Sequence, residues 1–158
     1  MYAVVDIETT GNGYKGQKIT EISIFIFDGK TVVDEYTSLV NPEQNIPPFI
    51  TNLTGITNAM VRYAPKFYEI ARKVQEITKD AIFVAHNVNF DYKFLSKSFK
   101  RFGLGEIANR KVCTIELAKK TISSQKYGLS HLNDVLHLQN NARHRALGDA
   151  KATATLLL

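Results

Sequence analysis

The sequence has a single cysteine, Cys113, and contains no long apolar run. One cysteine excludes an internal disulfide framework and a cysteine-rich zinc site, because both need several thiols. No segment approaches the roughly 20 consecutive apolar residues that span a bilayer. The amino terminus reaches Asp6 too soon to hold the apolar region of a signal peptide. We therefore expect a cytoplasmic protein without a membrane partner.

Glycine and proline are also few: the nine glycines and four prolines are scattered and do not form a linker. There is no internal repeat and no low-complexity tract, and no glycine-rich run ends in Lys-Ser or Lys-Thr, which excludes a P-loop enzyme. At 158 residues with 44% hydrophobic composition, the chain can bury one sizeable core. We predict a single domain over residues 1–158, which is either excised from a longer chain or has an ordinary frayed terminus.

Positive charge exceeds negative charge: the formal net charge is +5 and the isoelectric point is about 9.3. This balance favours a polyanionic partner, because each neutralised phosphate releases counterions. Lys93, Lys97, Lys100 and Arg101 follow one another at helical spacings of three and four. These four cations are either a solvated helix face or a track for a phosphate backbone.

Short apolar runs alternate with helical periodicities along the chain. The apolar runs predict strands over residues 2–8, 19–27, 32–40, 82–85 and 110–114. Helices are expected from Pro65, after Asp91, and over 115–121, 130–137 and 145–158. A meander of three strands followed by alternating strands and helices predicts an α/β fold. Its five-stranded mixed sheet has an antiparallel meander, two parallel strands and helices on both faces.

Several local signals refine this outline. Asp28-Gly29 predicts a hairpin turn, and the prolines of residues 41–48 predict an irregular loop. Ser130 is a candidate N-cap. The helix after Asp91 should bury Phe94, Leu95, Phe99 and Phe102.

Asp6 and Glu8 stand two residues apart at the end of an apolar strand, so their side chains leave the same face. They are either the solvent-facing half of that strand or the ligands of a cation. Two acids at the end of an apolar strand are costly without strong donors or a cation. Hard carboxylate oxygens suit magnesium or manganese rather than zinc.

Two further segments carry candidate functional groups. In the first, Asp91 is either a helix N-cap or a ligand gathered at a strand end, and His86 could be a satisfied core histidine. In the second, His144 and Asp149 are five residues apart and would not share a helix face. We expect His144 in the loop before the last helix, where its imidazole suits a general base.

Together these segments closely resemble the DEDDh family of 3′-to-5′ exonucleases, which includes polymerase proofreading subunits and has an RNase H-like fold. The three matching motifs are Asp6-Ile7-Glu8-Thr9-Thr10-Gly11, residues 86–91 and residues 144–149. The resemblance implies that His144 is the general base. It also implies two Mg²⁺ or Mn²⁺ ions, held by four carboxylates: Asp6, Glu8, Asp91 and Asp149.

The same resemblance implies that the terminal nucleotide binds beside Thr9 and a second segment. The residue pattern of that segment, without the resemblance, predicts only a loop. That segment consists of Leu53, Thr54, Gly55, Ile56 and Thr57. Many relatives carry an aspartate where this chain has Cys113, which we interpret as a buried packing residue.

The implied function is hydrolysis of DNA from the 3′ end, in proofreading or repair, with release of nucleoside 5′-monophosphates. Its partners would be a single-stranded 3′ end and a polymerase or a further domain. One rival is an exoribonuclease of the same family, since nothing in the sequence reveals contacts to a 2′ hydroxyl. The other is a non-catalytic nucleic-acid-binding or polymerase-docking module, which would gain nothing from four unneutralised carboxylates.

Overall fold

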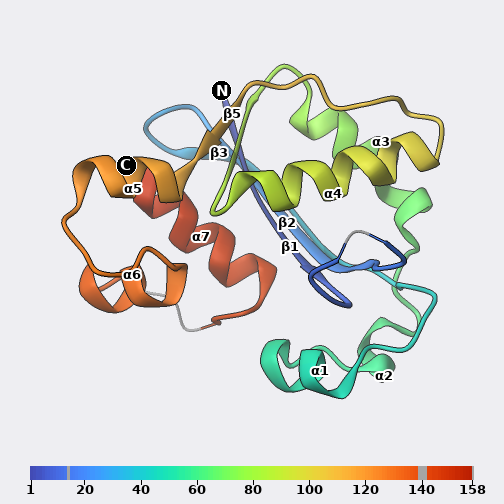
Figure 1. Cartoon of the computed structure of the whole chain (residues 1–158). Helices are drawn as coiled ribbons and strands as arrows, with labels where there is room; N and C mark the ends of the chain where they lie inside the picture. The colour runs from blue at the N-terminus through green and yellow to red at the C-terminus, as the bar shows by residue number, and fades with distance from the viewer. Residues whose placement is uncertain (14, 139–141, 158) are drawn as a thin grey trace.

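One mixed sheet organises the chain, with helices on both of its faces (Figure 1). The computed structural model describes residues 1–13, 15–138 and 142–157. The strands run in the order β3-β2-β1-β4-β5. Their bounds are β1 (Tyr2–Thr9), β2 (Ile19–Phe27), β3 (Val32–Leu39), β4 (Ile82–Ala85) and β5 (Lys111–Cys113). β1, β2 and β3 pair antiparallel, while β4 and β5 run parallel to β1, so the predicted sheet is confirmed.

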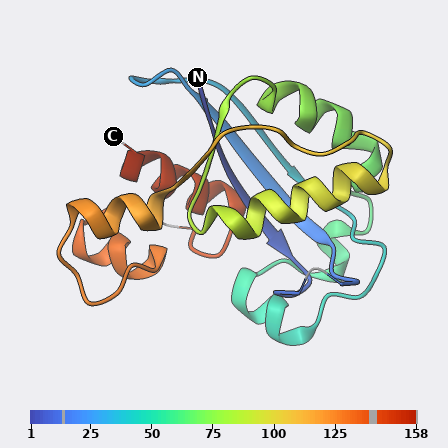
Figure 2. The same cartoon turned by 45° about the horizontal axis from the view of Figure 1, so that its top comes forward.

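The helices divide between the two faces of the sheet and its ends (Figures 1 and 2). α3 and α4 cover one face and α7 covers the other, while α1 and α2 lie beyond the carboxyl end of β1. Their bounds are α1 (Pro48–Thr54), α2 (Asn58–Val61), α3 (Phe67–Thr78), α4 (Val88–Arg101), α5 (Thr114–Thr121), α6 (Leu129–Val135) and α7 (Ala146–Leu157). Among the described residues, no helix has the length and hydropathy needed to cross a membrane.

Strand β2 shows why both faces need a covering layer, because every one of its residues is buried. Ile22 and Ile24 belong to the core beneath α3 and α4, whereas Phe25 belongs to the core beneath α7. Alternating side chains point to opposite faces of a strand, so each cover receives its own apolar row. The predicted helical cover on both faces of the sheet is therefore confirmed at this strand.

Small side chains hold α7 against the sheet. Ala150 and Ala154 pack against Val4 and Phe25, and Gly148 is buried as well. Side chains of this size let the helix axis approach the strands closely. The first turn of α7 therefore lies beside β1, which matters for the site described below.

The structure corrects several local predictions. Residues 48–61 contain two helices, although no helix was predicted there and residues 53–57 were expected to form a loop. α1 begins at Pro48, since proline is tolerated in a first helical turn. α3 begins at Phe67 rather than Pro65, because the Lys66 N–H donates to the Glu69 carboxylate and caps the helix there. The prediction for Ser130 was wrong: Gly128 is the N-cap of α6.

Two side chains that were expected to be buried are not. Phe102 follows the end of α4 and is 38% exposed, because the chain leaves the helix before this residue can reach the inner face. Cys113 is only partly buried at the end of β5, although it does pack against the core. The Asp28-Gly29 turn is confirmed, with the Asp28 carboxylate accepting from the Lys30 and Thr31 N–H groups.

Candidate active site

Asp6 and Glu8 leave the carboxyl-terminal half of β1 on the same face as Val4, which is the face covered by α7. A register shift between Glu8 and Thr9 ends the regular pairing with β2 directly after them. Asp6 Oδ2 is buried and accepts no hydrogen bond from any part of the chain that the structure describes. The two acids therefore face a protein layer, and they are not the solvent-facing half of the strand.

Asp91 enters the site from the first turn of α4 and is only 3% exposed. β4 pairs with β1 only as far as Val4, so the later backbone groups of β1 lose that neighbour. The Ile7 N–H donates instead to Asp91 Oδ1 at 3.2 Å. The helix N-cap is Asn87, in a left-handed conformation that asparagine tolerates, so the alternative in which Asp91 is the cap was wrong.

Asp149 lies in the first turn of α7, the helix that packs against Val4 of β1. Carboxylate oxygens of Asp6, Glu8 and Asp149 lie within 4.8 Å of one another, although these residues are up to 143 positions apart in the sequence. We refer to this trio together with Asp91 as the acidic cluster. The structure thus brings together three of the four carboxylates that the sequence singled out, and the charge of the fourth, Asp91, acts on the nearby Asp6.

The electrostatics of the acidic cluster show how unfavourable it is without a counter-charge. Burial, and then the charges of Asp91, Glu8 and Asp149, raise the pKa of Asp6 well above its ordinary value. Burial and the neighbouring acids, Asp149 first, raise the pKa of Glu8 to about 9. Burial raises the pKa of Asp91 to about 8 against the hydrogen bond from Ile7. Each shift favours the neutral acid, because burial removes water from the carboxylate and, at Asp6 and Glu8, the neighbouring negative charges add repulsion.

This chemistry fits a divalent metal ion. The cluster offers only carboxylate oxygens, which are hard ligands of the kind that magnesium and manganese prefer. The buried Oδ2 atom of Asp6 has lone pairs that no hydrogen bond from the described residues satisfies. A bound cation would satisfy that oxygen and replace the mutual repulsion of the four acids by attraction.

An ion pair anchors α7 next to the cluster, and sequence reasoning missed it. Glu21 of β2 is directly opposite Glu8 and is 3% exposed. Its carboxylate accepts from Arg145 Nε at 2.9 Å, from Arg145 Nη2 at 2.8 Å and from the Ala146 N–H at 3.0 Å. A lone acid inside the apolar run 19–27, and an arginine directly after His144, were the signals that could have revealed it.

His144 lies in the loop before α7, as expected, and is exposed. Its backbone is left-handed, with φ of 58°, and its N–H donates to Asp149 Oδ2 at 3.0 Å. This contact ties the histidine segment to a carboxylate of the cluster. The imidazole is left accessible from solvent at the edge of the site.

His86, in contrast, is held at both ring nitrogens. Nδ1 lies 2.8 Å from Thr114 Oγ1, and Nε2 lies 2.8 Å from the Tyr127 carbonyl oxygen. Burial lowers the pKa of His86, which favours the neutral ring. This histidine therefore joins β4 to α5 and the chain before α6, in agreement with its interpretation as a satisfied core residue.

The residues expected beside the terminal nucleotide divide into exposed and supporting groups. Leu53 is 52% exposed on α1, whereas Thr54 and Ile56 are buried. Gly55 ends α1 with φ of 77°, and Thr57 caps α2 by accepting from the Met60 N–H. These contacts define the turn of residues 53–57 between two short helices.

Thr9 is 7% exposed, and its hydroxyl donates to the Gly11 carbonyl oxygen at 2.7 Å. This bond supports the turn that follows the first motif.

Comparison with known proteins gives the family. The RNase_T exonuclease family model matches residues 3–157. The 3′-5′ exonuclease DinG of Staphylococcus epidermidis is 39% identical over 158 residues, and that of Staphylococcus haemolyticus is 38% identical over 158 residues. In both comparisons the match covers 99% of this chain and 18% of the relative. The chain thus spans about a fifth of the length of these curated relatives.

Solved structures agree with this result. Exonuclease X in complex with 5′ overhanging duplex DNA is 30% identical, with a TM-score of 0.74, and the match covers 99% of this chain and 89% of that one. Exonuclease I of E. coli, in complex with an oligonucleotide, has a TM-score of 0.88 at 16% identity. The match covers 98% of this chain and 39% of that one, and it shows the shared fold. The chain therefore belongs to the RNase_T exonuclease family, which confirms the resemblance to DEDDh-type 3′-to-5′ exonucleases.

Proposed function

We propose that this domain removes nucleotides one at a time from the 3′ end of single-stranded DNA, using Asp6, Glu8, Asp91 and Asp149 to hold two Mg²⁺ or Mn²⁺ ions. The observation that carries the proposal is the acidic cluster, in which three carboxylates from β1 and α7 lie within 4.8 Å of one another. DNA as the substrate is supported by the DNA-bound state of the similar exonuclease X structure. A non-catalytic module would have no use for such a costly group of acids.

Each residue has a distinct task in this mechanism. Metal ions bound to the cluster would lower the pKa of a water molecule and stabilise the leaving 3′ oxygen. The imidazole of His144 takes the proton from the attacking water, and it can do so because it is exposed beside Asp149. Arg145, bound to Glu21, holds the start of α7 so that Asp149 and His144 keep their places.

The terminal nucleotide would lie between Thr9 and residues 53–57. Leu53 supplies an exposed apolar side chain for the base, while Thr54, Gly55, Ile56 and Thr57 keep the turn rigid.

We infer that the domain works in the cytoplasm, where Cys113 stays reduced. A polymerase, or a further domain of a longer polypeptide, is the partner that would deliver a 3′ end in proofreading or repair.

A time course on oligonucleotides labelled at the 5′ end tests this proposal. In magnesium, single-stranded DNA should shorten in steps of one nucleotide and release nucleoside 5′-monophosphates, whereas in EDTA it should stay intact. Mismatched duplex and RNA of the same sequence, run in parallel, identify the preferred substrate. Faster shortening of RNA would favour the exoribonuclease, and no shortening of any substrate in magnesium would refute the nuclease function.

A further inference from the structure

A small groove lies between the carboxyl-terminal half of α4 and the segment that joins β1 to β2. Its volume is about 130 Å³. One wall includes Lys18, the α4 wall includes Lys97 and Arg101, and aromatic residues complete the lining: Phe67, Phe94 and Phe102. We refer to this feature as the basic groove. None of the residues that line it belongs to the acidic cluster.

The charge of the basic groove is positive. Three of its lining residues are cations, and the one acid among them, Glu43, forms an ion pair with Lys66 at 3.2 Å. Lys100 belongs to the same helix but lies outside the groove, where it pairs with Glu106 at 3.0 Å. The groove therefore takes two of the four cations of α4 and adds Lys18 from the opposite wall.

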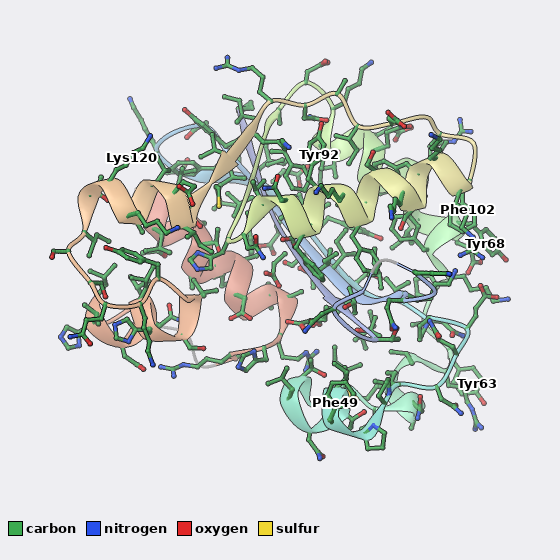
Figure 3. The ribbon with its side chains drawn as sticks, in the orientation of Figure 1. Phe49, Tyr63, Tyr68, Tyr92, Phe102 and Lys120 are labelled. Carbon is green, nitrogen blue, oxygen red and sulfur yellow. The ribbon has the colours of Figure 1, made fainter. Side chains whose placement is uncertain are left out.

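Exposed aromatic rings continue the groove at the end of α4. Phe102 is 38% exposed and Tyr68 is 52% exposed, with ring centroids 6.0 Å apart (Figure 3). The Arg101 guanidinium lies 5.9 Å from the centre of the Phe102 ring. Cations that neutralise phosphates beside aromatic faces that stack on bases are the two components of single-strand binding sites.

The β1–β2 wall of the groove connects directly to the candidate active site. Thr10, which follows Thr9, donates through its N–H to the Lys18 carbonyl oxygen at 2.8 Å. The Lys18 N–H donates in turn to Thr10 Oγ1 at 3.0 Å. The position of Lys18 is therefore fixed by the end of the first motif.

The α4 wall also begins at the site. Phe90, Phe94, Lys97 and Arg101 recur at spacings of four, three and four, so they share one flank of the helix. This flank starts next to Asp91 and ends in the groove. Ten residues of helix span roughly 15 Å. At the 3.4 Å spacing of a duplex strand this distance corresponds to about four nucleotides, and a more extended single strand covers it with fewer.

We propose that the basic groove binds the phosphate backbone of a single-stranded nucleic acid within about four nucleotides upstream of the 3′ end that enters the acidic cluster, with Phe102 and Tyr68 stacking on its bases. The proposal rests on the proposed nuclease function for the placement of that 3′ end. Binding to the groove itself can be measured without catalysis.

The first test measures binding of a twelve-nucleotide oligothymidylate, labelled with fluorescein, in EDTA over a series of salt concentrations. The Lys97→Gln/Arg101→Gln variant should bind about tenfold more weakly, and the slope of log K against log salt should become shallower by about 1.4, or 0.7 for each lost phosphate contact. The matched control, Lys93→Gln/Lys100→Gln, removes two charges from the same helix outside the groove. Equal changes in both variants, or none in the groove variant, would overturn the proposal.

The second test compares substrates of different length in magnesium. A dinucleotide ends before the groove, so the ratio of kcat/KM for the twelve-nucleotide substrate to that for the dinucleotide should fall about tenfold in the groove variant. An unchanged ratio would contradict the upstream position of the groove. A wild-type enzyme that hydrolyses neither substrate would refute the proposed function, and the binding measurements in EDTA would still decide whether the groove binds the strand.

Discussion

The two ends of α4 carry opposite charge in opposite surroundings. At its start, Asp91 is buried within the acidic cluster, while at its end Lys97 and Arg101 are exposed in the basic groove. The signs agree with the helix dipole, which favours acids in the first turn and bases in the last. The free-energy cost of folding differs greatly between the two ends. The exposed cations keep most of their hydration, whereas the buried acids lose theirs and repel one another.

This contrast assigns catalysis to the acidic cluster and strand binding to the basic groove. The acidic cluster destabilises the fold in the absence of a cation, and its buried carboxylates supply the strong local field that metal-assisted hydrolysis uses. The basic groove can change by one residue at small cost, so it is suited to setting how tightly a strand is held.

The largest effect is expected at the acidic cluster. Asp149→Asn should lower kcat in magnesium by about 10⁴-fold or more, because it removes a charged ligand without changing side-chain size. Release of mononucleotides from a labelled oligonucleotide measures this loss. Asp34→Asn, an exposed acid of β3, is the matched control and should keep the wild-type rate. Activity within tenfold of wild type in Asp149→Asn would break the assignment of the cluster.

The second effect concerns the general base. His144→Ala should lower kcat about 10³-fold with little change in KM, since a base contributes typically 10² to 10⁴ to the rate. Steady-state kinetics on single-stranded DNA separate the two parameters. His137→Ala alters another exposed histidine and should leave kcat unchanged. A wild-type kcat in His144→Ala would show that a different group accepts the proton.

The third prediction uses the raised pKa values of the acidic cluster. Folding holds the pKa of Glu8 at about 9 and that of Asp91 at about 8, against ordinary values of 4.5 and 3.8. Between the ordinary and the raised pKa values, the folded state therefore binds more protons than the unfolded state. The free energy of unfolding is highest below the ordinary pKa values and falls as the pH rises through about 8 to 9.

Thermal unfolding in EDTA should show this loss as a fall in Tm of about 5–10 °C from pH 6 to pH 9. Magnesium should raise Tm more at pH 9 than at pH 6, because it binds the ionised carboxylates. A Tm in EDTA that rises over this range would contradict the burial of the acids.

The smallest effect is expected at the anchor of α7. Arg145→Met should lower the free energy of unfolding by about 2 kcal/mol, because it leaves Glu21 buried without its partner, while the partial exposure of Arg145 reduces the cost. Urea denaturation measures this change, and Glu21→Gln/Arg145→Met should recover more than half of it. Lys119→Met breaks the exposed pair with Glu116 and should cost less than about 0.5 kcal/mol. Equal losses of unfolding free energy in Arg145→Met and Lys119→Met would contradict the expectation that the partly buried ion pair stabilises the fold more than the exposed one.

Local patterns predicted most of the fold. The alternating residues of β2, the Asp28-Gly29 turn and the apolar run of β4 are read directly from side-chain order, since a strand or a turn depends on near neighbours. α1 and α2 were missed because they are short, and their stability comes from a small separate core around Ile50 and Ile56. Phe102 was misplaced because one residue past a helix end changes which way a side chain points.

The sequence by itself determined the family, the strand order of the meander and the candidate catalytic residues, because motif spacing and apolar periodicity are properties of neighbouring residues. Only the tertiary structure decided that Glu21 forms an ion pair with Arg145, and that Lys18 lines the same groove as Lys97 and Arg101. These contacts join residues up to 124 positions apart. Such partners come together only when the sheet and its two helical layers have formed, so a local pattern can mark a charged residue but cannot say which partner it contacts.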